Sequence, residues 1–284
     1  MPAWEPAAAT TPDPDYADRL DRARVLLRGR RIVALTGAGV STASGIPDYR
    51  SPGAPRRTPM TLQQFLGSAE FRRRYWARNH LGWRHMDAAR PNAAHRALAA
   101  LPGVTGVITQ NVDLLHLKAG SRGVIDLHGN YAQVRCLTCE NRISRHRLHA
   151  QLEPLNAGFV ARIAGRGALE VAPDADVVVE DTTDFTMVDC GACGGILKPD
   201  IVYFGESVPK PRVERAFALV DGADALLVLG SSLTVMSGLR FVRHAHKHDI
   251  PVVIINRGRT RGDDLADVTV DVDVATALHR LAAP

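Results

Sequence analysis

Four cysteines form the pattern in this sequence that most directly indicates chemistry. All of them belong to Cys-x-x-Cys pairs, Cys136 with Cys139 and Cys190 with Cys193. Two such pairs, in a chain with no recognisable secretory leader, indicate a zinc site rather than a disulfide framework. Four thiolates complete the tetrahedral coordination of Zn²⁺ and leave no position for water, so we expect one structural zinc ion and not a metallohydrolase. The pairs stand further apart than the usual spacing of roughly 15–20 residues, so the chain between them must loop out.

A glycine-rich turn follows the first apolar segment and reads Thr-Gly-Ala-Gly-Val-Ser-Thr-Ala-Ser-Gly at residues 36–45. Glycines at such a turn let the backbone approach a pyrophosphate, and N–H groups at a helix start attract its charge. The usual dinucleotide pattern has glycine where Thr42 stands and an acid about 20 residues later, where this chain has Arg56 and Arg57. The turn therefore predicts a site for a phosphate-bearing nucleotide that is not held as in common dehydrogenases. An ordinary glycine-rich turn is the alternative.

Polar residues that suit a nucleotide follow further along the chain. Thr-Gln-Asn-Val-Asp at residues 109–113 ends the next apolar segment, and its side chains suit ribose hydroxyls and a carboxamide. Asx turns that cap a strand end are the alternative. His128 stands beside a glycine in a predicted loop, and an unperturbed imidazole titrates near neutral pH, so His128 is the candidate general base. A structural histidine is the alternative. We assign His95 and His116 to packing or to a helix surface.

Two further segments allow more than one interpretation. The extended segment Leu197–Glu206 could offer a free edge to an incoming peptide strand, or it is an ordinary edge strand. His244, His246 and His248 suggest a metal cluster at first sight. Only His244 and His248 would share a helical face, and no carboxylate completes a ligand set there, so a solvated surface is the better interpretation.

The elements that must position these residues alternate between apolar strands and helical stretches. Near-continuous apolar strands that end in polar residues predict a doubly wound parallel α/β sheet of Rossmann-like type, with ligands outside the carboxyl ends of the strands. The expected strands are Ile32–Leu35, Val104–Thr109, Ala225–Leu229, Val252–Ile255 and a weaker Val268–Val272. The expected helices are Tyr16–Arg28, Leu62–Trp83, Asn92–Leu101, Arg212–Val220 and Gly238–His248.

Residues 131–200 interrupt this alternation and hold all the cysteines. We therefore expect residues 15–130 and 201–284 to form the Rossmann-like nucleotide-binding unit and residues 131–200 to form an inserted zinc-binding lobe. Residues 1–14, rich in Ala, Pro and Thr, are expected to be a disordered tail. The tail resembles neither a signal peptide nor a transit peptide, and no apolar run reaches the roughly 18 residues of a membrane span. The expectation is a cytoplasmic protein without a membrane partner.

The charge balance favours no particular partner. The formal net charge is +5 and the pI about 9.3, which is compatible with nucleic-acid binding. The basic residues are nearly all arginines spread along the chain, however, so compositional bias explains them at least as well. We expect no dedicated nucleic-acid surface.

The order of the motifs resembles one known family. Between residues 37 and 258 the motifs occur in this order: Gly-Ala-Gly-x-Ser-x-x-Ser-Gly-Ile-Pro-Asp-Tyr-Arg, Thr-Gln-Asn-Val-Asp, Leu-His-Gly, the paired cysteines, Lys-Pro-Asp-x-Val-x-Phe-Gly-Glu, Gly-Ser-Ser-Leu-x-Val and Ile-Asn-Arg-Gly. This closely resembles the sirtuins, the NAD-dependent protein deacylases. The Pro-Asp-Tyr-Arg sequence and the long stretch between the cysteine pairs are most similar to class II, the branch related to the mitochondrial lipoamidase-type sirtuin.

The resemblance implies a site for NAD as co-substrate. It implies that the pyrophosphate lies near Gly37 and Ser231, that Asp113 faces the carboxamide, and that Asn256 takes the adenine ribose. The last role would account for the missing acid after the first turn. The residues that the resemblance assigns to NAD are Gly37, Ala38, Gly39, Ser41, Ile46, Asp48, Tyr49, Arg50, Gln110, Asn111, Val112, Asp113, Gly230, Ser231, Ser232, Asn256, Arg257, Gly258 and Val274.

The resemblance also implies a reaction on acyl-lysine-bearing proteins or peptides. The acyl oxygen attacks C1′ of the ribose as nicotinamide leaves, with His128 and Asn111 as catalytic residues and His128 removing a proton from a ribose hydroxyl. Water then completes the transfer to give lysine and O-acyl-ADP-ribose. Peptide binding falls to Val202, Phe204 and Gly205. The loop from Ile46 to Pro59 is expected to close over the site.

Two alternative functions remain open from the sequence. In an ADP-ribosyltransferase, a side chain or water captures C1′ in place of the acyl oxygen. A non-catalytic NAD sensor is less consistent with a candidate base beside Asn111 and Asp113. Tyr75 and Arg78, three apart on a predicted helix, have the spacing by which some sirtuins recognise acidic acyl groups. The helix carries several other arginines, however, so a solvated helix face is the better interpretation.

Overall fold

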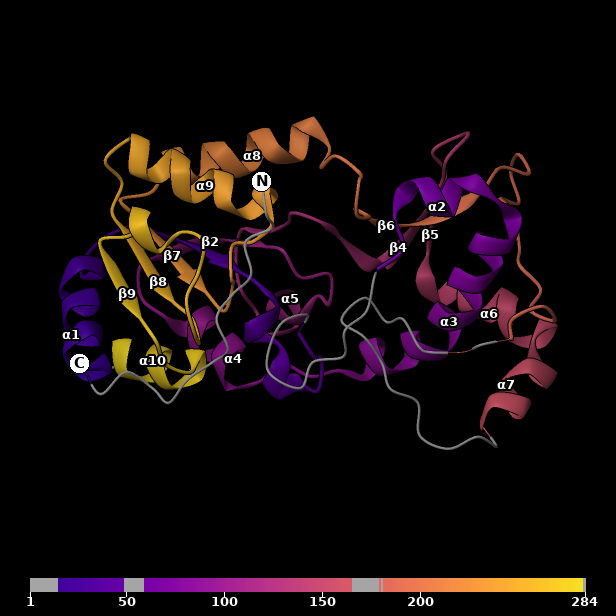
Figure 1. Ribbon diagram of the computed structural model, residues 1–284, viewed down its shortest axis with the longest axis horizontal. Coiled ribbons are helices and arrows are strands. Elements are labelled where there is room, and N and C mark those ends of the chain that lie inside the picture. The colour runs from indigo at the N-terminus through magenta and orange to yellow at the C-terminus, as the bar shows by residue number, and fades with distance from the viewer. Residues whose placement is uncertain (1–14, 49–58, 165–178, 180, 283–284) are drawn as a thin grey trace.

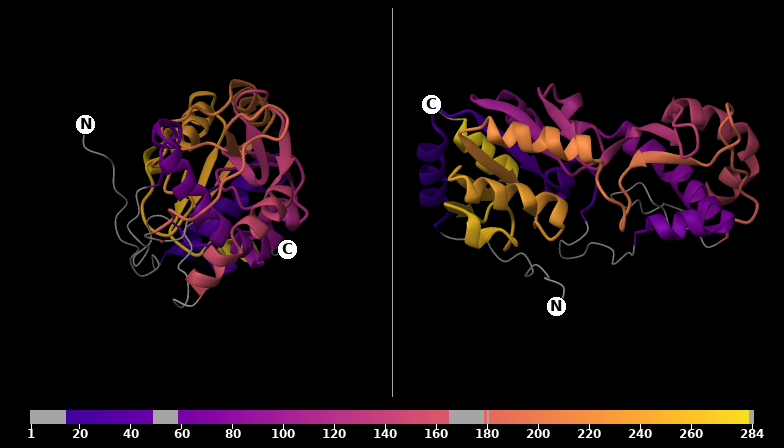
Figure 2. Two further views of the ribbon diagram at one scale, coloured as in Figure 1. Left: turned by 90° about the vertical axis from the view of Figure 1, so that its right-hand side faces the viewer. Right: turned by 90° about the horizontal axis from the view of Figure 1, so that it is seen from above.

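The structure, a computed structural model, describes residues 15–48, 59–164, 179 and 181–282. Two lobes lie along the long axis of the molecule (Figures 1 and 2). The larger lobe is built on a six-stranded sheet in which every neighbouring pair is parallel, in the order β3-β2-β1-β7-β8-β9. The strands are β1 (Ile32–Thr36), β2 (Val104–Thr109), β3 (Val124–Asp126), β7 (Ala225–Leu229), β8 (Val252–Ile255) and β9 (Val268–Val270). The predicted doubly wound parallel fold is confirmed.

Helices cover both faces of this sheet because its strands are apolar on both sides. Along β1, Ile32 and Ala34 belong to one hydrophobic cluster and Val33 and Leu35 to another. This alternation follows from the two-residue period of a strand. The first cluster packs against α1 (Tyr16–Leu27), α4 (Ala93–Ala100) and α10 (Val274–Leu281), and the second against α8 (Lys210–Asp221) and α9 (Met236–Lys247) (Figure 1).

One predicted helix is wrong as a single element. The expected Leu62–Trp83 helix is divided into α2 (Leu62–Gly67) and α3 (Ala69–Ala88). Ser68 has an extended backbone between them, and its hydroxyl accepts a hydrogen bond from the N–H of Phe71 at 3.1 Å. Serine competes with helix geometry by capping the next helix, which is the physical reason for the break.

The smaller lobe contains a three-stranded antiparallel sheet in the order β5-β4-β6. Its strands are β4 (Gly129–Cys136), β5 (Arg142–Ser144) and β6 (Leu197–Ile201), and its helices are α6 (Arg145–Leu155) and α7 (Ala157–Ala164). One hydrophobic cluster joins these elements to α2 and α3, which precede them by many residues in the chain (Figure 1). Within the part of the chain that is described, no helix combines the length and the apolar character needed to cross a membrane.

Candidate active site

A cavity of about 540 Å³ lies where the carboxyl ends of β1, β2, β7 and β8 meet the segment after β6. The chain order of the sheet reverses between β1 and β7, and ligands of open α/β sheets bind at such a switch point. The volume falls in the range of roughly 300–1,000 Å³ that small-molecule sites occupy. The sequence prediction of a ligand site at these strand ends therefore agrees with a real cavity.

Close backbone approach explains two glycines of the turn after β1. The N–H of Gly37 donates to Leu229 at 3.1 Å and that of Gly39 to Gly230 at 2.9 Å, both to carbonyl oxygens. A Cβ at Gly37 would lie 2.7 Å from the Cβ of Ser231, and one at Gly39 would lie 2.9 Å from the carbonyl oxygen of Gly230. No larger residue fits at either position without moving the chain that follows β7.

The expected α-helix start after this turn is not formed. The turn continues instead as two short 3₁₀ segments, η1 (Ala38–Val40) and η2 (Thr42–Ser44). Gly45 then takes a left-handed conformation with φ of +80° and ends the second segment. The macrodipole of a long helix therefore contributes nothing here, and individual N–H groups are what the turn can offer to an anion.

Ser41 connects the turn to the residues that follow β2. Its hydroxyl donates to Oδ2 of Asp113 at 2.6 Å and accepts from Nδ2 of Asn111 at 3.0 Å. Asn111 Nδ2 also donates to the carbonyl oxygen of Gly37, and the N–H of Leu115, at the start of α5 (Leu115–Lys118), donates to Oδ1 of Asp113. Burial raises the pKa of Asp113, while the Ser41 hydrogen bond opposes that rise. The serine thus holds both predicted site residues in one orientation.

Gln110 and Asn256 are held by equally direct contacts. The amide of Gln110 donates to the hydroxyl of Ser231 at 2.7 Å, so the chain after β2 is joined to the chain after β7 past the intervening strand β1. Asn256 Nδ2 donates to the carbonyl oxygens of Arg257 and Gly258, at 2.7 and 3.0 Å, and so stabilises the turn after β8. The residues in these contacts are Gln110, Ser231, Asn256, Arg257 and Gly258, all of which the family resemblance assigns to NAD. All but Gly258 lie in the cavity wall.

His128 has a partner at each ring nitrogen. Nδ1 lies 2.9 Å from the carbonyl oxygen of Gln110, and Nε2 lies 2.8 Å from the hydroxyl oxygen of Ser237. Burial lowers the pKa of His128 to about 4, with the Gln110 carbonyl acting in the opposite direction. The ring is therefore neutral at physiological pH and able to accept a proton. Gly129 makes this placement possible, because its φ is +79° and a Cβ there would overlap the carbonyl oxygen of Asp200.

The segment after β6 runs beside His128. The N–H of Val202 donates to the carbonyl oxygen of His128 at 2.7 Å. Phe204 forms a parallel bridge with Thr61 and leaves 45% of its side chain exposed, although it is a large apolar residue. β6 is an edge strand of the small sheet, and the segment that follows it pairs with Thr61 at that bridge.

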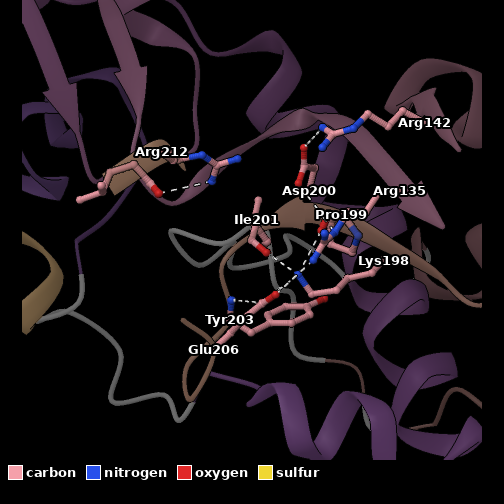
Figure 3. A network of polar contacts seen from close by, with 10 residues as sticks. Arg135, Arg142, Lys198, Pro199, Asp200, Ile201, Tyr203, Glu206 and Arg212 are labelled. Carbon is pink, nitrogen blue, oxygen red and sulfur yellow. Dashed lines mark hydrogen bonds and ion pairs between the residues drawn. The ribbon is translucent and has the colours of Figure 1, made fainter. Parts of the chain in front are cut away.

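A buried ion pair joins the two ends of the stretch that contains this segment, Lys198 and Glu206 (Figure 3). Nζ of Lys198 lies 2.9 Å from Oε2 of Glu206, and the lysine side chain is only 1% exposed. The same ammonium donates to the carbonyl oxygen of Ile201 and lies 4.5 Å from the ring centroid of Tyr203. Glu206 Oε2 also accepts the N–H of Tyr203 at 2.9 Å. Burial lowers the pKa of Lys198 while Glu206 raises it, so the carboxylate is what keeps the ammonium charged.

The four cysteines converge as the sequence predicts. Their Sγ atoms all lie within 4.8 Å of one another. Sγ of Cys136 is 3.5 Å from that of Cys193, and Sγ of Cys139 is 3.7 Å from that of Cys190. These separations fit a single tetrahedral ion, since Zn–S bonds are about 2.3 Å long. The donor set consists of thiolates alone, so it suits Zn²⁺ in a closed, structural role.

The remaining predicted residues are placed as follows. The cavity wall contains Gly37, Ala38, Gly39, Ser41, Ile46, Asp48, Gln110, Asn111, Val112, Asp113, His128, Val202, Phe204, Gly205, Gly230, Ser231, Ser232, Asn256 and Arg257. Gly258 and Val274 do not line it, and Val274 is buried at the start of α10. Tyr49, Arg50 and most of the expected lid lie outside the described residues. Tyr75, 4% exposed, packs against the rings of Phe65 and Tyr203 and does not line the cavity.

Two histidines that the sequence analysis assigned to packing or a helix surface are buried, as packing requires. His95 and His116 are both fully buried behind the site, with their rings 4.9 Å apart and Nε2 of His116 2.9 Å from the hydroxyl of Thr36. Burial lowers the pKa of His95 to about 4 and that of His116 to about 3, so both rings are neutral. Sequence reasoning missed Ser237, although it lies close behind the Gly-Ser-Ser-Leu-x-Val motif. Its position there was the one signal available.

Comparison with known proteins agrees with this geometry. The profile of the Sir2 family matches residues 37–237. The chain is 63% identical over 260 residues to NAD-dependent protein deacetylase 1 of Mycobacterium avium (strain 104), covering 90% of this chain and 92% of that protein. It is 51% identical over 286 residues to NAD-dependent protein deacetylase 1 of Streptomyces coelicolor, covering 99% of this chain and 93% of that protein.

Solved structures share the same architecture. A complex described as Sir2-p53 peptide-NAD+ superposes with a TM-score of 0.73 at 32% identity, covering 92% of this chain and 96% of that one. A Sir2 complex with 2′-O-acetyl-ADP-ribose and deacetylated p53 peptide gives a TM-score of 0.71 at 31% identity over the same shares. A Rossmann-like sheet with a four-thiolate lobe, together with relatives named NAD-dependent protein deacetylases, defines an enzyme of the NAD-consuming class. The chain belongs to the Sir2 family, the sirtuins.

Proposed function

We propose that this chain is an NAD-dependent protein-lysine deacylase of the deacetylase type, which cleaves NAD to nicotinamide and O-acyl-ADP-ribose. One observation carries this function. His128, Asn111 and Asp113 converge on the same cavity that starts at the glycine-rich turn, although His128 comes from a separate segment. A chain that merely sensed NAD would need no neutral, accessible base in that cavity. The relatives named as NAD-dependent protein deacetylases support the same conclusion.

The cavity wall fits NAD as co-substrate. Glycines 37 and 39 leave no Cβ between the backbone and a pyrophosphate, and the hydroxyl of Ser231 stands beside them. In our proposal Asp113 faces the carboxamide of nicotinamide, and Gln110 and Asn111 face its ribose. Asn256 faces the adenine ribose at the far end. We keep Gly258 among the NAD-binding residues because its carbonyl accepts a hydrogen bond from Asn256. We keep Val274 because its position in the sequence matches that of the residue that contacts adenine in the family.

Bound NAD supplies an electrophilic ribose carbon, C1′, to the oxygen of the acyl-lysine. The residues of this chain then position the reactants and handle the proton. Asn111, fixed by Gly37 and Ser41, orients the ribose face that the acyl oxygen approaches. His128 accepts the proton of a ribose hydroxyl at Nε2, because Nδ1 is engaged with Gln110.

The substrate side of the reaction uses the segment after β6. We propose that acyl-lysine-bearing proteins or peptides add as an extended strand along Val202, Phe204 and Gly205, which line the cavity. The exposed Phe204 ring would cover the apolar part of the lysine chain. Similar structures described with p53 peptide and with a propionylated peptide support a peptide as the substrate.

Finer assignments complete the proposal. The Pro-Asp-Tyr-Arg sequence and the long spacing between cysteine pairs support class II within the sirtuins. We propose residues 15–130 with 201–284 as the NAD-binding unit and 131–200 as the inserted zinc lobe, against which α2 and α3 pack. Zinc, held by the four cysteines, has a structural role there. A cytoplasmic location is supported by cysteines that are arranged for metal rather than for disulfides.

Nicotinamide release tests this function. Wild-type protein is incubated with NAD, with and without an acetyl-lysine peptide, and nicotinamide and O-acetyl-ADP-ribose are measured. We expect release that requires the peptide and falls by roughly 10²-fold or more in His128→Ala. His246→Ala, which removes an exposed imidazole from α9, is the matched control and should retain full activity. Release that ignores both the peptide and His128 would overturn the proposal, and ADP-ribose attached to protein would indicate the transferase alternative.

A further inference from the structure

Ser237 is the one side chain that contacts the reactive nitrogen of His128 among the described residues. It lies in the first turn of α9, and its hydroxyl oxygen is 2.8 Å from Nε2. The serine lines the same cavity as the base. The function proposed above gives it no role.

The protons of this contact follow from the acceptor on the other side of the ring. Gln110 offers a carbonyl oxygen to Nδ1, and a carbonyl can only accept, so Nδ1 carries the hydrogen of the neutral ring. Nε2 is then a bare acceptor, and the Ser237 hydroxyl donates to it. When Nε2 takes up a proton, the contact reverses, because N–H now donates and the serine oxygen accepts.

The reversed contact is the stronger of the two. A hydrogen bond from an imidazolium is charge-assisted, whereas the bond in the neutral state is not. The charged groups that act on His128 from the packed elements are Arg212 of α8 and Arg240 of α9, and both disfavour a positive charge on the His128 ring. The protonated ring therefore gains from any oxygen that can accept a hydrogen bond at Nε2.

The acids that line the cavity interact with other groups. Asp113 accepts from Ser41 and Leu115, Glu206 pairs with Lys198, and Asp48 has an interaction of its own. Among the described residues, the Ser237 oxygen is the acceptor that lies in hydrogen-bond contact with Nε2. It is therefore the group placed to stabilise the imidazolium.

The local chain geometry fixes this serine in place. Gly238, the next residue, is so close to Gln110 that a Cβ there would lie 2.7 Å from the amide oxygen of that side chain. The start of α9 is thus packed directly against the residue whose carbonyl holds Nδ1. Gln110, His128 and Ser237 form one rigid unit in which the ring is held from both sides.

We propose that Ser237 is a positioning residue of the deacylation reaction, which orients His128 toward the cavity and stabilises the imidazolium that proton transfer creates. The inference rests on the proposed function, since it assumes that His128 is the base. The chemistry balances within the site. The ribose hydroxyl replaces the Ser237 hydroxyl as donor to the single lone pair of Nε2 and leaves its proton there, and the resulting N–H then donates to the Ser237 oxygen.

The pH dependence of kcat/KM for an acetyl-lysine peptide, at saturating NAD, tests the proposal. Ser237→Ala removes the stronger bond of the protonated ring, so the pKa of His128 falls and the acidic limb moves to lower pH by roughly half to one unit. A weaker, less oriented base should also lower the plateau by about three- to tenfold, with KM for NAD unchanged. Ser237→Thr keeps a hydroxyl and should restore both the limb and most of the rate. A limb that stays in place, or moves to higher pH, in Ser237→Ala overturns the proposal.

A second readout separates this proposal from the proposed function. In protein labelled with ¹⁵N-histidine, the His128 resonance is assigned by its loss in His128→Ala, and its titration needs no turnover. We expect the titration midpoint to be lower in Ser237→Ala than in wild type and to return in Ser237→Thr. Equal midpoints in all three proteins refute the role of Ser237. A lower midpoint in Ser237→Ala than in wild type, together with wild-type protein that releases no nicotinamide in the presence of the peptide, would refute the deacylase function and leave the contact between Ser237 and His128 established.

Discussion

Lys198 and Glu206 form an ion pair with a separation of 2.9 Å that closes the intervening chain into a loop. The loop contains the segment that we propose for peptide binding, and its shape depends on a lysine that is only 1% exposed. A buried ion pair is rarely a net source of stability, but the loss of one partner is costly. We therefore interpret the pair as a device that holds the loop in one conformation.

Lys198→Met tests this interpretation. The change leaves the Glu206 carboxylate without its closest cation, so we expect the free energy of unfolding to fall by about 3 kcal/mol. KM for the peptide should rise severalfold, while KM for NAD stays the same because the NAD-facing strand ends are untouched. Both constants come from initial rates, and stability comes from urea denaturation. The double variant Lys198→Met/Glu206→Gln should be more stable than Lys198→Met, and strictly additive losses would contradict the pair.

Gly129→Ala should separate the base from the small sheet. The new methyl group would overlap the carbonyl oxygen of Asp200, and alanine resists the φ of +79° at this position. We expect a loss of about 2–4 kcal/mol in unfolding free energy and a large fall in kcat, because the neighbouring His128 is displaced. Gly158→Ala is the matched control. A Cβ at Gly158 meets nothing within 4 Å, and the residue lies in α7, so stability should be equal or higher. Equal behaviour of the two variants would refute the close approach.

Local patterns explain why most of the large lobe could be predicted. β2, β7 and β8 have the bounds that their apolar runs indicate, since a strand buried on both faces needs such a run. β3 escaped prediction because Val124–Asp126 has three half-buried residues and no such run. Ser68 interrupted a helical pattern in a way that hydrophobic spacing does not reveal.

The candidate site also contains residues that local patterns predicted and residues that they did not. Glycines, cysteines and the residues after β2 stand in motifs, so their order along the chain was enough to indicate where they lie in the fold. Ser237 and Lys198 act through contacts that local patterns do not show, with His128 and Glu206 respectively. His95 and His116 looked like packing residues, and only the fold shows that they lie directly behind Ser41 and Thr36. Such contacts are properties of the tertiary structure and leave no local signature.

Acid should destabilise the large lobe through its buried histidines. Burial lowers the pKa of His116 to about 3, whereas an unfolded histidine titrates near 6.5. Below pH 6.5 the unfolded chain therefore binds a proton that the folded chain refuses, so this contribution to stability is complete above pH 6.5 and is lost as the pH falls toward 3. One such residue accounts for roughly 1.5 kcal/mol between pH 6.5 and 5. Unfolding free energies in that range should depend less steeply on pH in His116→Gln than in wild type. His246→Gln, at an exposed position, should keep the wild-type slope, and an unchanged slope in His116→Gln would contradict the assignment.

Zinc removal should unfold the small lobe rather than only slow the reaction. Cys136 and Cys190 are buried in the hydrophobic cluster that holds Trp76, whose indole donates to the carbonyl oxygen of Leu197 at 3.3 Å. Trp83 is also buried in α3, at 5% exposure. In a Trp4→Phe background both remaining tryptophans report on this lobe.

Chelation should shift their emission to longer wavelength and expose them to a soluble quencher, because four free thiols cannot hold the cysteine-bearing turns together. Added Zn²⁺ should reverse the change. The large lobe keeps its own core without the metal, so part of the helical circular dichroism signal should remain. Protein that elemental analysis shows to be free of zinc, but whose tryptophan spectrum is native, would refute the structural role. In that event the thiolate cluster would have to serve the reaction itself, and its lack of an open coordination position argues against such a role.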